Sequence, residues 1–127
     1  MLDKDELLQE AIAQVGLSDF GGDDFLEPLE RLTDALNKEA RLNDFGNIRA
    51  RMTINSGLAN RLRIQDYLQR HPEVRDEVVA RPVFIVGLPR TGTTALHHML
   101  TQEGGNRTLR LWGAQNPVPR RGGGSYT

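Results

Sequence analysis

The sequence predicts an α/β fold, in which a helical N-terminal region precedes the first βα unit of an α/β domain. Three observations lead to this prediction. Residues 1–72 carry apolar side chains at three- and four-residue steps, the period of amphipathic helices. Residues 83–86 form a short, fully apolar run, which is typical of a strand buried on both faces of a parallel sheet. A glycine-bounded loop at 87–92 then leads directly into a helix-compatible segment.

The first expected helix has clear start and stop signals. Asp3 and Glu6 have the spacing of a capping box, and Gly16 can end the helix in a left-handed conformation. Its apolar face is expected to consist of Leu8, Ala11, Ile12 and Val15.

A second helix is expected to start between Asp24 and Glu27, because Pro28 is tolerated only in a first turn. Its apolar positions are Phe25, Leu29, Leu32, Leu36 and Ala40.

A third helix is expected after Asn43-Asp44, running to about Arg70 and ended by His71-Pro72. Its inward-facing residues are expected to be Met52, Leu58, Leu62 and Leu68. The arginines along it predict a solvated face made of Arg49, Arg51, Arg61 and Arg63.

The domain organisation follows from the change in character after residue 80. We expect a helical region at 1–80, the start of an α/β domain at 81–119, and a disordered tail at 120–127, which has almost no apolar content. A single parallel strand cannot hide both faces, and a βαβ unit needs a second parallel strand. The chain supplies none, so we expect it to be the N-terminal part of a larger α/β protein or a truncated copy of one.

Composition excludes several functional classes. Cysteine is absent, which rules out disulfide frameworks, thiolate metal sites and cysteine nucleophiles. The N-terminus is acidic where a signal peptide would be basic, and no apolar run reaches membrane-spanning length, so a cytoplasmic location is expected. Residues 46–127 contain 12 basic residues, all arginine, against 5 acidic ones. Arginine suits phosphate or sulfate recognition, although a codon preference would produce the same composition.

The loop at 87–94 predicts an anion-binding site. It reads G-x-x-x-x-G-T-T, whereas the P-loop of nucleotide hydrolases reads G-x-x-x-x-G-K-[ST], so Thr93 stands at the lysine position. The glycines allow backbone N–H groups to turn inward, and the following helix points its positive end at the ligand. Thr93 and Thr94 add hydroxyl donors, and Arg90 adds a positive charge.

The same residues resemble a known family. Pro89-Arg90-Thr91-Gly92-Thr93-Thr94 after a strand is similar to the motif P-[KR]-[ST]-G-[TS]-[TS] of sulfotransferases that use 3′-phosphoadenosine-5′-phosphosulfate (PAPS). The wider context is similar to a bacterial branch of that family, through His71-Pro72-Glu73, His97, Asn106-Arg107, Trp112 and Pro117-Val118-Pro119. In one departure, Gly113 stands where that branch usually has glutamate. In another, the family's 3′-phosphate-binding residues would fall beyond Thr127.

This resemblance implies a P-loop-like sulfotransferase domain that transfers a sulfuryl group from PAPS to a hydroxyl or amine acceptor, without a metal. It implies that Arg90 stabilises the bridging oxygen and that Thr93 and Thr94 bind the 5′-phosphate. The residues that would bind PAPS are Gly87, Pro89, Arg90, Thr91, Gly92, Thr93 and Thr94. His97 is a candidate general base, although a structural role is an alternative for both His97 and His98.

Other interpretations remain open. The chain could be a non-catalytic truncated remnant or a helical interaction module, or a P-loop nucleotide kinase or NTPase lacking its lysine. The loop could also be a tight turn without a ligand. The expected partner is a small-molecule acceptor rather than nucleic acid or a membrane. Self-association through the exposed strand is expected, and Trp112 is expected to be a core residue.

Overall fold

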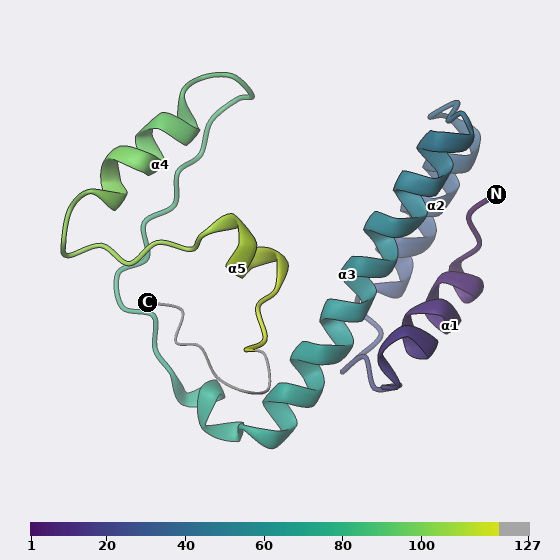
Figure 1. Cartoon of the computed structure of the whole chain (residues 1–127), viewed down its shortest axis with the longest axis horizontal. Coiled ribbons are helices and arrows are strands. Elements are labelled where there is room, and N and C mark those ends of the chain that lie inside the picture. The colour runs from purple at the N-terminus through teal and green to yellow at the C-terminus, as the bar shows by residue number, and fades with distance from the viewer. Residues whose placement is uncertain (120–127) are drawn as a thin grey trace.

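The computed structural model describes residues 1–119, and every regular element among them is helical. The helices are α1 (Lys4–Val15), α2 (Leu26–Lys38), α3 (Asp44–Arg70), the 3₁₀ helix η1 (Pro72–Asp76), α4 (Thr93–Thr101) and α5 (Leu111–Gln115). Figure 1 shows α1, α2 and α3 packed in one arm, while the chain after η1 swings round to α4 and α5 in a second arm. The expected disordered tail at 120–127 lies outside the described residues.

The predicted helix boundaries are confirmed by the caps. Asp3 accepts hydrogen bonds from the backbone N–H groups of Asp5 and Glu6, both at 3.0 Å, so it caps α1 as its position in the sequence predicts. Gly16 ends α1 with φ 69°, a left-handed conformation that suits glycine. Asn43 caps α3 through its side chain, which accepts from Gly46 N at 2.8 Å.

His71, which follows the last residue of α3, makes two side-chain contacts in addition to ending the helix. The His71 ring stacks on Tyr67 with ring centroids 4.4 Å apart, and its Nδ1 lies 3.0 Å from Glu73 Oε1. A backbone hydrogen bond of Glu73 lowers the pKa of its carboxyl, and the bond to His71 lowers it further. The segment 71–73 therefore fixes the corner at which the chain leaves the helical arm.

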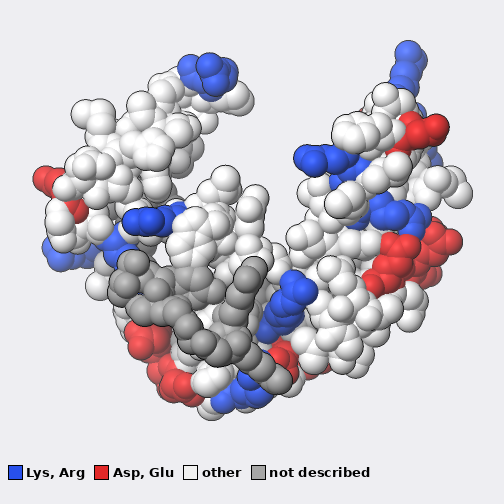
Figure 2. Space-filling model, viewed as in Figure 1, with Lys and Arg blue, Asp and Glu red and all other residues white. Residues whose placement is uncertain are grey.

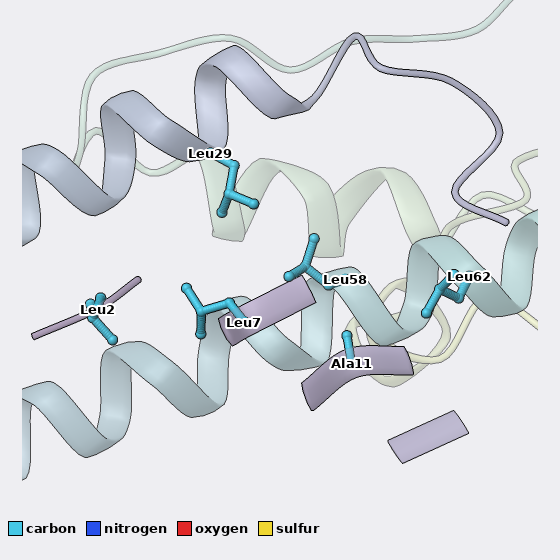
Figure 3. Close-up of a cluster of buried hydrophobic side chains, with 6 residues drawn as sticks. All are labelled: Leu2, Leu7, Ala11, Leu29, Leu58 and Leu62. Atoms are coloured by element: carbon cyan, nitrogen blue, oxygen red, sulfur yellow. The ribbon is translucent and has the colours of Figure 1, made fainter. Parts of the chain in front are cut away.

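The hydrophobic core lies where α1 crosses α3, with one contribution from α2. Figure 3 shows its six buried residues: Leu2, Leu7, Ala11, Leu29, Leu58 and Leu62. The inward positions predicted from periodicity are thus confirmed in part, and Leu7 joins them. Met52 and Leu32, also expected to face inward, are 63% and 46% exposed. Leu32 lines an open apolar groove between α2 and α3, and Ala40 lies beyond the end of α2.

The predicted solvated arginine face on α3 is wrong for Arg51. This side chain reaches α1, where it pairs with Glu10 and, at 3.2 Å, with Glu6. The hydrogen bond that Arg51 donates to Glu6 raises the pKa of Arg51, so its guanidinium stays charged in this position.

Arg61 also departs from the predicted solvated face. Its Nε donates to the carbonyl of Phe20 at 2.8 Å, and a terminal nitrogen lies 2.5 Å from the Asp24 carboxylate. The guanidinium carbon sits 4.4 Å from the centroid of the Phe25 ring, a cation–π arrangement. Arg61 thereby ties the α1–α2 loop to α3. Arg49 and Arg63 are exposed, as predicted.

The predicted strand at 83–86 is not formed in the described part of the chain. Phe84 and Val86 are 81% and 91% exposed, and the segment pairs with no other strand among residues 1–119. A strand needs a neighbour for its backbone hydrogen bonds, so the apolar run stays extended without one. The expected βα unit is therefore present only as an extended segment followed by α4. Trp112, expected in a core, is 45% exposed.

We predict that Arg51→Ala destabilises the α1–α3 arm by about 1 kcal/mol, because it removes both carboxylate partners at a half-buried position. The matched control is Arg49→Ala, an exposed arginine on the same helix, with an expected change under about 0.5 kcal/mol. Urea denaturation followed by circular dichroism measures both. Equal midpoints for the two variants would contradict the prediction.

Candidate anion-binding site

The loop between the extended segment and α4 folds back on itself through its own side chains. The Thr91 hydroxyl donates to the carbonyl of Leu88 at 2.6 Å, which closes the turn at Pro89 and Arg90. Arg90 has φ 68°, in the left-handed region that few non-glycine residues adopt. Such a conformation stores strain and is commonly found where a loop presents a functional group. The side chain of Arg90 is consequently held at the exposed apex of the loop.

Gly87 is required by the closeness of the returning chain. A Cβ at this position would lie 2.9 Å from Thr91 Oγ1 and 2.9 Å from Thr93 Cγ2. Both atoms belong to side chains that are themselves candidate ligand contacts. Glycine at 87 therefore lets the two threonines pack over the start of the loop.

The N-terminus of α4 presents free backbone donors to the loop. Its N-cap is Gly92, with φ 89°, and no described side chain caps the helix. The first intrahelical bond runs from Leu96 N to Gly92 O at 3.0 Å, which leaves the N–H groups of Thr93, Thr94 and Ala95 for an external acceptor. The helix dipole adds partial positive charge at the same end. This arrangement is suited to an anion.

The electrostatics of the loop favour a phosphate or sulfate. Residues 87–94 contain no acidic side chain and one cation, Arg90. The hydroxyls of Thr93 and Thr94 sit at the start of α4 beside the free N–H groups. The predicted ligand residues are therefore brought together in one short stretch of backbone, exposed to solvent except for the half-buried Thr93.

His97 shares a helix face with the loop residues. It follows Thr93 by four positions, so the two side chains lie on the same face of α4, and both are half-buried. Side chains on a helix lean toward its N-terminus, which directs the His97 ring toward the loop. His98 points elsewhere and is exposed, with its ring 5.9 Å from that of His97 in an edge-on arrangement.

The described residues contain neither a group of side chains that could hold a metal ion nor a helix that could span a membrane. Residues 1–119 contain no cluster of three or more histidine or carboxylate side chains placed to hold a metal ion. No helix in the same range combines the length and apolarity needed to cross a membrane.

Sequence reasoning missed two features of the site. The strained Arg90 backbone depends on the turn that Thr91 closes, and only the folded loop reveals it. The close approach at Gly87 likewise depends on where the Thr93 side chain returns. In the sequence, only the two glycines of the motif, Gly87 and Gly92, indicate that the backbone is tightly turned here.

Comparison with known proteins finds a family model that matches the loop and the helix after it. The model of the sulfotransferase family matches residues 82–125, which include the whole loop and α4. Among curated proteins, no significant match is found.

Two solved structures resemble most of the chain. The sulfotransferase STF1 from Mycobacterium tuberculosis is 40% identical, with a TM-score of 0.87, over 94% of this chain and 33% of the STF1 chain. The sulfotransferase STF9 from Mycobacterium avium is 35% identical, with a TM-score of 0.82, over 91% of this chain and 29% of its own. The chain thus spans about a third of the length of these relatives, over an N-terminal portion.

We predict that Gly92→Ala unwinds the start of α4, because an alanine at φ 89° costs about 1–3 kcal/mol and a helix of 9 residues has little stability of its own. Gly105→Ala is the control, since a Cβ there meets nothing within 4 Å. Backbone chemical shifts of residues 93–101 report the loss of helix. Similar shifts for both variants would show that the left-handed cap is not what starts α4.

Proposed function

We propose that this chain, which belongs to the sulfotransferase family, forms the part of a PAPS-dependent enzyme that binds the 5′-phosphosulfate group of the donor. The observation that carries the proposal is the loop at 87–94, closed by Thr91 and followed by the uncapped N-terminus of α4. It lies inside the region that the family model matches.

The residues of the loop fit the donor by charge and geometry. PAPS, when bound, would supply the sulfuryl group; the bond between sulfur and the bridging oxygen breaks, and the 3′-phosphoadenosine-5′-phosphate that leaves carries the additional negative charge on its 5′-phosphate. The free N–H groups of Thr93 and Thr94, together with their hydroxyls, would hold that phosphate. Gly87, Pro89, Thr91 and Gly92 would shape the loop around it. No carboxylate in the loop opposes such an anion.

Arg90 would act on the transfer step itself. A fixed cation at the loop apex can stabilise the charge that develops on the bridging oxygen as the bond to sulfur breaks. Such an interaction is stronger in the transition state than in the ground state, so it accelerates the reaction and adds little to binding. His97, on the face of α4 that points to the loop, is the candidate base for the acceptor hydroxyl or amine.

The remaining parts of a working enzyme would come from outside this chain. The chain spans about a third of the length of STF1 and STF9, so the 3′-phosphate contacts and most of an acceptor pocket would lie in the remaining two thirds. We therefore propose a small-molecule acceptor at the family level, and we expect no sulfuryl transfer by the isolated chain. Its exposed segment at 83–86 also favours self-association, which sedimentation velocity would detect.

Ligand choice tests the proposal against a nucleotide kinase or NTPase. Thr93 stands at the position of the P-loop lysine, so we predict that a chimera of this chain with the remaining two thirds of STF1 binds 3′-phosphoadenosine-5′-phosphate at least about tenfold more tightly than ATP. Isothermal titration calorimetry measures both affinities. Tighter binding of ATP, with turnover, would favour the kinase, and binding of neither nucleotide by a folded chimera would favour a non-catalytic module.

Substitutions in the loop test the assigned roles in the same chimera. We predict that Arg90→Ala lowers kcat by about 100-fold or more, as removal of one preorganised donor does elsewhere, with a smaller effect on KM. Arg90→Lys should retain part of the activity because it keeps the charge. Thr94→Ala should mainly raise KM for PAPS. Steady-state kinetics with PAPS varied separates these effects, and the reverse pattern for Arg90 and Thr94 would reverse their roles.

A further inference from the structure

Thr91 differs from the other two threonines of the loop in how its hydroxyl is used. The hydroxyl donates its single proton to the carbonyl of Leu88 at 2.6 Å. A carbonyl only accepts, so this proton is committed and cannot also be donated to a bound anion. Among residues 1–119 the hydroxyls of Thr93 and Thr94 make no hydrogen bond, so they stay available as donors. Thr91 therefore has a different task from its neighbours.

The bond of Thr91 spans a turn that arginine does not favour. Pro89 fixes its own φ at about −65°, and the next residue, Arg90, has φ 68°. This order resembles a type II turn, in which the residue after the proline has positive φ and is usually glycine or asparagine. The hydroxyl of Thr91 bonds across these two residues to Leu88, and so stabilises a backbone conformation that is costly for arginine.

Positive φ by itself does not distinguish Arg90. Among the residues that the structure describes, Arg41 and Arg81 also have positive φ, at 46° and 54°, but neither is followed by a residue with a hydroxyl. Thr91 Oγ1 also packs against Gly87, where an added Cβ would lie only 2.9 Å from it. The left-handed backbone of Arg90 is thus held by a side chain that is itself held in place.

The backbone conformation of Arg90 determines which way its guanidinium can extend. A change from φ 68° to the right-handed region near −60° would turn the side chain by roughly 130° relative to the preceding peptide. The guanidinium makes no ion pair or hydrogen bond within the described chain, so it is free to meet an anion. Figure 2 shows basic atoms and no acidic ones on the visible face at the end of the second arm, where the chain turns into α4.

We infer that Thr91 is a positioning residue for Arg90. Its hydroxyl keeps Arg90 left-handed, so that the guanidinium and the free N–H groups of α4 meet the same phosphosulfate group, and it makes no bond to the donor itself. This inference rests on the function proposed above and refines it, because Thr91 then acts through Arg90 rather than through the general shape of the loop.

Sulfate titration of the full chain, followed by proton–nitrogen NMR, tests the inference with a probe that needs no PAPS. Sodium sulfate replaces sodium chloride at constant ionic strength. In the wild type, the amides of residues 93–95 and the Nε–H of Arg90 should shift along one saturation curve. Thr91→Val removes the hydroxyl and keeps the shape. The amides should still shift, whereas the Arg90 response should fall at least about threefold, since one hydrogen bond no longer favours the left-handed state.

A second signal reports the backbone directly. A strong NOE between the amide and α protons of Arg90 indicates positive φ, and it should weaken in Thr91→Val. Thr91→Ser keeps the hydroxyl and should match the wild type in both signals. Thr101→Val is the matched control, because the Thr101 hydroxyl also donates to the carbonyl three residues earlier, that of His98, near the other end of α4. It should change neither signal.

Each outcome decides one question. Amides that respond while Arg90 of the wild type does not, or an Arg90 response unchanged in Thr91→Val, would overturn the inference and leave the anion site standing. Amides of the wild type that do not respond would contradict the proposed function and this inference with it. Where Thr91→Val alters the Cα shifts of α4, Thr91→Ser decides: a retained Arg90 response supports the inference, and a lost one overturns it.

Discussion

The packing of α1 across α3 is the contact on which the rest of the structure depends. Leu7 and Ala11 are fully buried against Leu58 and Leu62, and burial of such side chains contributes roughly 1.5–3 kcal/mol for each leucine. α3 is 27 residues long and continues for two turns past Leu62, the last core residue on it, to the corner at 71–73. Asn60, between the core residues Leu58 and Leu62, contacts α5 through the carbonyl of Gln115.

The candidate site is built on a different principle. It has no core beneath it in the described chain, and its shape comes from local features: the hydroxyl bond of Thr91, the left-handed backbone of Arg90 and Gly92, and the close approach at Gly87. Short-range constraints of this kind can form without tertiary packing. This explains how the loop at 87–94 keeps its shape in a chain that spans about a third of the length of STF1.

The groove between α2 and α3 and the extended segment at 83–86 show the opposite dependence. Both expose apolar side chains that packing would normally cover. A strand gains its hydrogen bonds only from a neighbour, and an apolar groove gains stability only from an occupant. The helices of the arm satisfy their backbone hydrogen bonds internally, whereas the apolar side chains that line the groove and those of residues 83–86 stay largely exposed among the described residues.

The sequence by itself determined the local elements of this protein. The caps at Asp3 and Asn43, the stop at Gly16 and the helix after Gly92 follow from side-chain chemistry within a few residues, so periodicity and capping signals predict them. Only the tertiary structure decided the fate of Arg51, Arg61, Met52 and the run at 83–86. The positions of Arg51 and Arg61 depend on partners that are far from them in the sequence, Glu10 and Phe20. The exposure of Met52 and of residues 83–86 reflects the lack of a packing neighbour for them among the described residues.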